Sequence, residues 1–302
     1  MVAHNSHTKE QVRVVRSKKT LKTTVLEIYS RRELLVFMVK KELSTKYRNS
    51  TIGFAWSMLN PAFMLAVYYF VFSYVMHNGI PEFVVYLMGG FLAWNFFSTS
   101  VQSASGAVVE NAGLVKKVSF PREVLALAKV GQAMVFFVLQ LFVLALTMAI
   151  IQFTPNFGQI YLLVPAIIVL VVFTSALCIL VSALNVFYRD VQHFVEVLMF
   201  GWFFGAPIVY SFTGHLANGL ARYHLTIPYM MDPIATVVMV FDRVLYGRVS
   251  SGSGAKYIQI LPNYSTVWYL GVMGVIFVGS LILMIIALKV FSRLEVNFAE
   301  EL

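Results

Sequence analysis

Six long apolar stretches constrain this chain more than any other feature of its sequence. A helix needs about 20 apolar residues to cross the hydrocarbon core of a bilayer, which is about 30 Å thick. Hydrophobic residues make up 59% of the chain and charged residues only 12%, whereas about a quarter of a globular protein is charged. The sequence therefore predicts an all-α integral membrane protein with six transmembrane helices, at Ser57–Met76, Val84–Ser103, Gly131–Ile151, Tyr161–Leu184, Phe194–Phe212 and Val267–Leu288.

A basic segment, residues 31–50, leads directly into the first span. Its apolar side chains recur at every fourth position, at Leu35, Val39, Leu43 and Tyr47. This spacing predicts an amphipathic helix whose cations fall largely on other faces, at Lys40, Lys41, Lys46 and Arg48. Such an interfacial helix is expected on the membrane surface, with its cations toward anionic lipid head groups. The polar residues 1–28 are expected to form a largely disordered tail, and residues 29–302 the transmembrane domain.

The positive charges are distributed unevenly among the predicted loops. The formal net charge is +9, and twelve Lys and Arg residues precede the first span. Four more lie between spans two and three, at Lys116, Lys117, Arg122 and Lys129, whereas the short loops 78–83 and 152–160 contain none. By the positive-inside rule, both termini are expected in the cytoplasm, with the chain in the inner or plasma membrane. The charge therefore reflects topology and not nucleic acid binding.

The loop between spans five and six, residues 213–266, contains apolar stretches too short to cross a bilayer. Stretches of about 10–14 apolar residues are typical of re-entrant or interfacial segments. The loop is therefore expected to be an external, re-entrant one that covers or lines a pathway. The alternative counts Pro228–Tyr246 as a seventh span, which would place the C-terminus outside. The charged residues Asp232, Asp242 and Arg243 within that stretch disfavour this alternative.

The sequence contains no recognisable motif for catalysis or metal binding. Cys178 is the single cysteine, and the six His residues never share a helix face as HxxxH or HExxH. The glycine-rich stretch Gly247–Lys256 lacks the Gly-Lys-Ser/Thr end of a phosphate-binding loop. Asp190 beside Arg189 is interpreted as a local ion pair or a helix-end contact and not as a catalytic acid. The sequence therefore predicts no catalytic residues, no metal site and no cofactor bound by this chain.

Several segments, in their order along the chain, resemble the membrane-spanning subunit of type-2 ABC exporters, in the branch that exports polysaccharides such as O-antigens and teichoic acids. They are RELLVFMVKKELSTKYRNSTIGFAWSMLNPAF, VYLMGGFLAWNFFSTSVQSASGAVVENAGLVKKVSFPREVLALA, NVFYRDVQH, APIVYSF and PYMMDPIATVVMVFDRVLYG. The resemblance extends from about Tyr29 to the C-terminus. One departure is Asp232, where the family would have Asn before the proline.

The resemblance implies a homodimer of this chain that pairs with two copies of an ATP-binding subunit, which would hold the ATP and Mg. The cytoplasmic loop 104–129 contains a short amphipathic stretch that resembles the family's coupling helix. Its implied docking residues are Glu110, Asn111, Leu114, Lys116 and Lys117, with Phe120, Pro121 and Arg122 fixing the entry into span three. A second cytoplasmic contact would involve Arg189 and Asp190.

Aromatic residues make up 15% of the chain, and many lie within the predicted spans. Their faces suit the apolar C–H surfaces of sugar rings. The substrate pathway is expected along spans one, two and five, at Tyr68, Tyr69, Phe72, Trp94, Asn95, Phe97, Trp202, Phe203 and Tyr210, with Gln102 as a further polar neighbour. The scarcity of charge in the spans favours a long neutral polymer. The resemblance implies a polyprenyl-linked cell-envelope polysaccharide.

Three other functions are compatible with part of this pattern. A type-2 ABC exporter of drugs, lipids or peptides would share the fold. An integral membrane glycosyltransferase or polymerase would need a carboxylate cluster at one membrane face. The predicted topology separates Asp190, inside, from Asp232 and Asp242, outside. A structural scaffold would leave the coupling-like helix and the external loop without a role.

Overall fold

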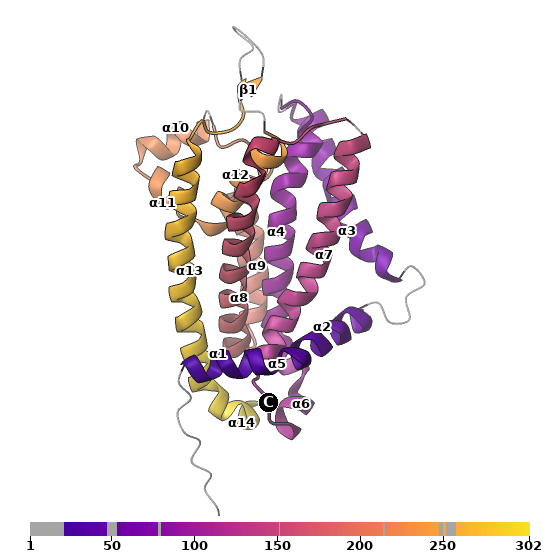
Figure 1. The fold of residues 1–302 in the computed structure, drawn as a ribbon, viewed down its shortest axis with the longest axis vertical. Coiled ribbons are helices and arrows are strands. Elements are labelled where there is room, and N and C mark those ends of the chain that lie inside the picture. The colour runs from indigo at the N-terminus through magenta and orange to yellow at the C-terminus, as the bar shows by residue number, and fades with distance from the viewer. Residues whose placement is uncertain are drawn as a thin grey trace, which may run out of the picture.

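The computed structural model describes residues 21–46, 53–77, 80–150, 152–213, 215–247, 250–251 and 258–302. Long apolar helices run side by side and form the body of the molecule (Figure 1). Within the described residues, four helical segments are long and apolar enough to cross a membrane. They are α4 (Phe83–Ser105), α7 (Glu123–Ile150), the 3₁₀ helix η3 (Phe157–Leu162) continued by α8 (Leu163–Phe187), and α13 (Thr266–Leu294). They coincide with predicted spans two, three, four and six, and confirm that these four stretches form helices of spanning length.

The other two predicted spans correspond to shorter helices. The short 3₁₀ helix η1 (Gly53–Ala55) leads into α3 (Trp56–Tyr69), which continues as the π-helix η2 (Phe70–Val75). Helix α9 (Val191–Gly205) ends before Pro207, because the residue preceding a proline is disfavoured in the helical region. Residues 206–212, expected to continue the helix, are instead irregular and mostly buried within the protein. That these two segments cross the membrane stays a prediction.

The long helices extend beyond the apolar stretches that predicted them. Helix α7 begins at Glu123, eight residues before the predicted span, and α13 continues to Leu294. Helix α13 is capped at its start by Ser265, whose hydroxyl accepts the backbone N–H of Trp268 at 3.2 Å. Apolar length therefore locates these helices but leaves out their polar ends.

Helix α4 occupies the centre of the bundle, where it packs against α7, α8 and α12 (Pro233–Leu245), while α13 packs along α8. Glycines bring α4 and α12 close together. A Cβ on Gly90 would lie 2.9 Å from Cγ1 of Val238 and one on Gly89 would lie 2.8 Å from Oδ1 of Asp242. These two positions therefore have no room for a larger side chain unless α12 shifts.

The segment between α9 and α13 enters the bundle and returns to the end from which it came. Thr213 donates to the carbonyl of Gln259 at 2.5 Å, at the end of the bundle that carries β1 (Ser250–Ser251) and its antiparallel partner β2 (Ile258–Gln259). Two short helices follow, α10 (His215–Arg222) and α11 (Thr226–Met230), and α12 then runs back to the same end. This path enters and leaves at one end of the bundle, and that it is re-entrant in a membrane stays a prediction. Helix α12, with 13 residues, is too short for the alternative seventh span.

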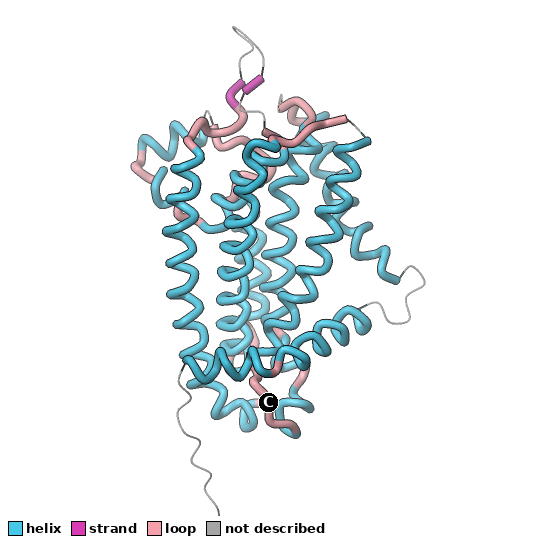
Figure 2. Tube along the Cα trace, viewed as in Figure 1, coloured by secondary structure: helices cyan, strands magenta, loops and turns pink. Residues whose placement is uncertain are grey.

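We call the end that carries these strands the β1 end and the opposite end the α2 end. Helices α1 (Leu21–Ser30) and α2 (Arg32–Lys46) run across the α2 end, roughly perpendicular to the long helices (Figure 1). Beside them lie α5 (Ala107–Glu110), α6 (Ala112–Lys117), the 3₁₀ helix η5 (Glu295–Asn297) and α14 (Phe298–Glu301). Most of the non-helical segments gather at these two ends (Figure 2).

One expectation for the N-terminal region needs correction. Residues 1–20 of the predicted tail lie outside the described residues, and α1 begins at Leu21. Lys41 was expected to point away from the apolar face, but it is half-buried and donates to Oδ1 of Asn111 at 2.7 Å. Leu35 and Val39 pack against the core, as the spacing predicts. Tyr47 and Arg48 lie outside the described residues.

Candidate functional site

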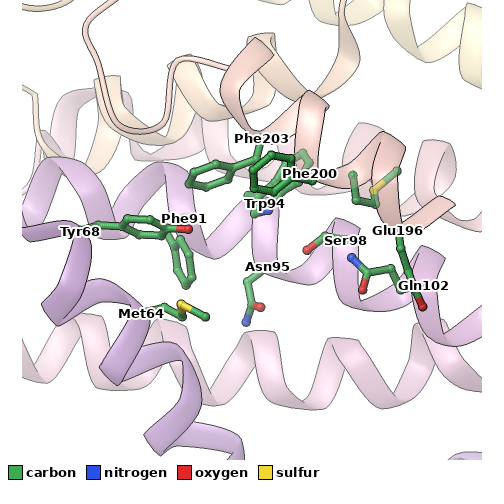
Figure 3. A pocket seen from close by; sticks show the side chains of 11 residues that line it. Met64, Tyr68, Phe91, Trp94, Asn95, Ser98, Gln102, Glu196, Phe200 and Phe203 are labelled. Atoms are coloured by element: carbon green, nitrogen blue, oxygen red, sulfur yellow. The ribbon is translucent and has the colours of Figure 1, made fainter. Parts of the chain in front are cut away.

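A groove of 260 Å³ lies between α3, α4 and α9 (Figure 3). Two of its walls follow helical spacing. Helix α4 supplies residues 91, 94, 95, 98 and 102, and α9 supplies residues 196, 199, 200 and 203, so each helix presents one face. The full lining is Met64, Tyr68, Phe91, Trp94, Asn95, Ser98, Gln102, Glu196, Met199, Phe200 and Phe203.

One part of the groove is aromatic. The ring of Tyr68 stacks on that of Phe203 with 5.2 Å between centroids and an interplanar angle of 24°. Trp94 meets Phe203 edge-on at 5.6 Å, and Phe91 meets Tyr68 edge-on at 6.1 Å. Figure 3 shows these rings gathered on one side of the groove. Because α3, α4 and α9 each contribute, the aromatic wall depends on how these three helices pack.

The other part of the groove is polar. Ser98, Gln102 and Glu196 lie together, away from Tyr68 (Figure 3). Asn95 sits between the two parts, and its amide donates to Oε1 of Gln140 on α7 at 3.1 Å. The carboxylate of Glu196 lies 3.7 Å from Nδ1 of His193, and both side chains are largely exposed. The groove therefore offers ring faces and hydrogen-bonding groups side by side, with Glu196 as its one lining carboxylate.

The structure brings together four of the nine predicted pathway residues, namely Tyr68, Trp94, Asn95 and Phe203, together with Gln102. The other five lie elsewhere. Phe97 and Trp202 pack against each other and against Phe173. The ring of Tyr69 packs against that of Tyr74, and the ring centroids of Phe72 and Phe83 are 6.3 Å apart. The Tyr210 hydroxyl donates to the carbonyls of Phe204 and Gly205. These five do not line this groove, and their place along a substrate pathway stays a prediction.

Six groove residues were not predicted: Met64, Phe91, Ser98, Glu196, Met199 and Phe200. Helical spacing along the chain could have identified those on α4. Starting from Trp94 and Asn95, the same face of a helix continues to Phe91, Ser98 and Gln102. A selection by residue type favours aromatic rings and passes over serine and methionine.

The predicted docking segment forms two short helices, α5 and α6, which meet at Asn111. Of the eight docking residues, five are buried, half-buried or bound to the C-terminal region. Asn111 and Pro121 are buried, Leu114 and Phe120 are half-buried against the core, and Arg122 is bound to the C-terminal region. Arg122 donates to the carbonyl of Glu295 at 2.7 Å, lies 3.5 Å from its carboxylate, and stands over the ring of Phe298 at 5.8 Å.

The remaining three docking residues are accessible. Lys116 and Lys117 are exposed at the end of α6, and the Glu110 side chain is 56% exposed while its carboxylate binds Lys129 at 2.9 Å. Val118, which was not predicted, is 51% exposed. The second predicted contact is also accessible, since Arg189 and Asp190 are exposed and precede α9. Both exposed groups lie at the α2 end, because α8 ends and α9 begins there.

Within the described ranges, His, Cys, Asp and Glu residues do not form a group of three that could hold a metal ion. Asp190, Asp232 and Asp242, which a membrane enzyme would have to bring together, belong to different places: Asp190 precedes α9 at the α2 end, whereas Asp232 and Asp242 lie at the start and near the end of α12. These three Asp residues therefore do not come together as a paired-carboxylate centre.

Comparisons with known proteins agree with this arrangement. A family model described as "ABC-2 type transporter" matches residues 33–231. The chain is 34% identical over 223 residues to the O-antigen export system permease protein RfbA of Myxococcus xanthus, covering 74% of this chain and 84% of that protein. It is 28% identical over 269 residues to RfbA of Klebsiella pneumoniae, covering 89% and 94%. A shorter match, 30% identical over 76 residues, covers 24% of this chain and 30% of the polysialic acid transport protein KpsM of Escherichia coli.

Proposed function

The chain belongs to the ABC-2 type transporter family, and from that premise we propose that it is the permease subunit of an ATP-driven exporter of a cell-envelope polysaccharide. The polysaccharide is carried on a polyprenyl lipid and moves from the cytoplasm across the inner or plasma membrane. Support for the glycan comes from the relatives named as O-antigen export permeases, which cover most of this chain.

The observation that carries the proposal is the mixed lining of the groove. Sugar rings present apolar C–H faces and a rim of hydroxyl groups, so they bind where aromatic faces and hydrogen-bonding side chains alternate. Tyr68, Trp94 and Phe203 supply such faces, and Asn95, Ser98 and Gln102 supply polar groups beside them. The groove runs along α4 from Phe91 to Gln102, which is about 16 Å at 1.5 Å per residue, long enough for two or three sugar units.

One copy of the chain gives only one wall of a conduit. The groove is open on one side, so a second copy would close it into a path between the two subunits. A two-fold axis along the path would present the same groove twice, as closed homodimers do. We therefore place the homodimer axis alongside α3 and α9, whose outward faces carry exposed apolar residues such as Phe63, Phe194, Val197 and Phe200.

The free energy for transport would come from ATP hydrolysis by a separate subunit, because the sequence holds no phosphate-binding loop. Two ATP-binding subunits, which hold the ATP and Mg, would dock on the α2 end against the exposed residues of α6 and the turn before α9. Those residues are Lys116, Lys117, Val118, Arg189 and Asp190. This end, with both chain termini, would then face the cytoplasm, and α1 and α2 would lie along the lipid surface.

The test is reconstitution of this chain with its ATP-binding subunit in proteoliposomes. A fluorescent, polyprenyl-diphosphate-linked oligosaccharide is placed in the outer leaflet of the vesicles. Complexes inserted with their ATP-binding subunits on the outside should, when ATP is added, move the oligosaccharide inward, where an external glycosidase cannot cleave it. A nonhydrolysable nucleotide is the control for energy dependence. Transport of a lipid, drug or peptide by the same complex, with no movement of the glycan, would reject the polysaccharide and leave the exporter class intact.

A further inference from the structure

A cluster of four charged residues and an asparagine joins three elements at the α2 end. The ammonium group of Lys129, on α7, donates to the carboxylate of Glu42 on α2 at 2.7 Å and to that of Glu110 on α5 at 2.9 Å. Lys41 of α2 donates to Oδ1 of Asn111, between α5 and α6, at 2.7 Å. We call Lys41, Glu42, Glu110, Asn111 and Lys129 the linking cluster.

The linking cluster differs from a solvated patch of surface charge. The Lys129 side chain is only 9% exposed and that of Glu42 16%, so the bond between them is largely shielded from water and salt. Its two lysines and two glutamates sum to zero charge. Asn111 is held in turn by its own amide, which donates to the carbonyl of Ala107 at 2.9 Å. Each side chain of the linking cluster therefore has a hydrogen-bond or ion-pair partner within the cluster.

Helix α2 is also fastened to α7 directly. The side-chain amide of Gln132 donates to the backbone carbonyl of Glu42 at 3.1 Å. One turn away, Val39 sits against Gly131, where a Cβ would come within 2.6 Å of Cγ2 of Val39. The docking segment α5–α6, in contrast, reaches α2 through the bonds of Lys41 and Lys129. The bond from Lys41 to Asn111 is direct, whereas Glu110 is joined to Glu42 of α2 through Lys129 of α7.

Helix α7 carries Lys129 of the linking cluster and packs along α4, and Oε1 of Gln140 on α7 accepts the amide of Asn95 in the groove at 3.1 Å. A displacement of α5–α6 would pull on α2 through Lys41 and Asn111, and on α7 and α2 through Glu110, Lys129 and Glu42. Through α7 and α4, the same displacement would then reach the groove. The order of contacts is docking segment, linking cluster, α7, α4 and groove, with α2 packed on α7.

We propose that the linking cluster transmits ATP-driven movement of the docking segment to α2 and α7, and through α7 to the groove, with Lys41 and Lys129 as positioning residues. The inference rests on the proposed function, because it needs an ATP-binding subunit seated on α5–α6. It assigns Glu110 to a contact inside this chain and not to the partner. If Glu110 docked the partner, its substitution would weaken assembly of the complex. If Glu110 links α5 to α7, assembly should be unchanged.

The test compares Glu110→Gln and Lys41→Gln in the reconstituted complex. Neither change leaves a buried carboxylate without its partner: Glu110 is itself neutralised, Lys129 keeps Glu42, and Lys41 binds an uncharged group. We expect each variant to lower the number of glycans moved per ATP hydrolysed by about threefold or more, the size expected for loss of one partly exposed charged hydrogen bond. Yield of the complex and its ATP turnover should match those of the parent. Glu33→Gln, the same chemical change at an exposed position of α2, should leave the ratio unchanged.

A spin label on α2 supplies a readout that a purely structural role would not move. Phe37 is 62% exposed and Cys178, the single native cysteine, is buried, so Phe37→Cys can be labelled selectively. The label's mobility should change with ATP in the parent and stay constant in the Glu110→Gln/Lys41→Gln double variant.

The inference is wrong if both single variants move glycan with the parental yield per ATP, or if the label responds to ATP in the double variant. It is also wrong if Glu110→Gln prevents assembly while Lys41→Gln behaves as the parent, since Glu110 would then be a docking residue. A parental complex without ATP-driven export would instead contradict the proposed function.

Discussion

The indole N–H of Trp202 donates to Oδ2 of Asp232 at 2.9 Å, and the other carboxylate oxygen of Asp232 accepts the backbone N–H of Ile234 at 2.9 Å. One carboxylate thus caps the start of α12 and fastens it to the last turn of α9. This is the corner where the resemblance implied Asn before the proline and the chain has Asp232. The contact ties the groove helix α9 to the start of α12.

Replacing Asp232 should loosen this corner. Asp232→Ala removes the cap of α12 and leaves the Trp202 N–H without its partner, for a combined loss of about 2 kcal/mol. Asp232→Asn keeps an oxygen for one donor and should cost less. Thermal unfolding in detergent should rank the parent, then Asn, then Ala. An Ala variant as stable as the parent would show that the corner is held by apolar packing alone.

The crossing of α2 over α7 depends on Gly131. A methyl group there would collide with Val39, which lies 2.6 Å from the added Cβ, and such overpacking costs about 1–3 kcal/mol. Gly131→Ala should therefore lower the unfolding temperature, and adding Val39→Ala should restore part of the loss. Failure of the second substitution to compensate would mean that α2 has room to shift at this crossing.

Much of this fold could be predicted from apolar length alone. Four of the six predicted spans appear as long helices, because burying a backbone in lipid leaves few alternatives. The end of α9 at Gly205 was missed, although Pro207 marks it. The inward turn of Lys41 could not be found from spacing, since its partner Asn111 lies 70 residues away in the sequence. Long-range polar contacts leave no local pattern.

The candidate site was predicted less completely, for a different reason. Residues were chosen by aromatic character, which groups lining and packing positions together: Tyr68 lines the groove while its neighbour Tyr69 does not. Helical spacing separates the two once a single lining residue is known. Phe97 and Trp202 pack against each other within the bundle, where aromatic character reflects core packing.

Docking of an ATP-binding subunit can be tested at Val118. Its side chain is 51% exposed beside Lys116 and Lys117, whereas Leu114 is half-buried against this chain's own core. Val118→Asp should weaken assembly at least about tenfold if the residue enters an apolar groove of the partner, because a buried unpaired carboxylate is costly. Co-purification at graded salt measures this. Val296→Asp, at a 71% exposed position on η5, is the matched control, and equal behaviour of the two variants would remove Val118 from the interface.

The purified chain alone should hydrolyse no ATP. No Gly-x-x-x-x-Gly-Lys-Ser/Thr sequence is present to hold the phosphates. The measurement is phosphate release by the chain in nanodiscs, with and without the ATP-binding subunit. Turnover that survives removal of that subunit, and follows this chain through gel filtration, would contradict the assignment as a transport subunit.

Two adjacent tyrosines give a sharp test of the groove. Tyr68 lines it and stacks on Phe203, while Tyr69 packs against Tyr74 outside it. Stacking of a nucleic acid base on an aromatic side chain is worth about 1–3 kcal/mol, and a sugar contact should fall near the lower value, or about fivefold in rate. Tyr68→Ala should therefore slow glycan export several-fold in proteoliposomes, and Tyr69→Ala should not. Tyr68→Phe keeps the ring and should retain most of the export rate, which separates stacking from hydrogen bonding by the hydroxyl. Equal slowing by the Tyr68 and Tyr69 alanine variants would show that both act through packing of α3, and the path of the polymer would then lie elsewhere.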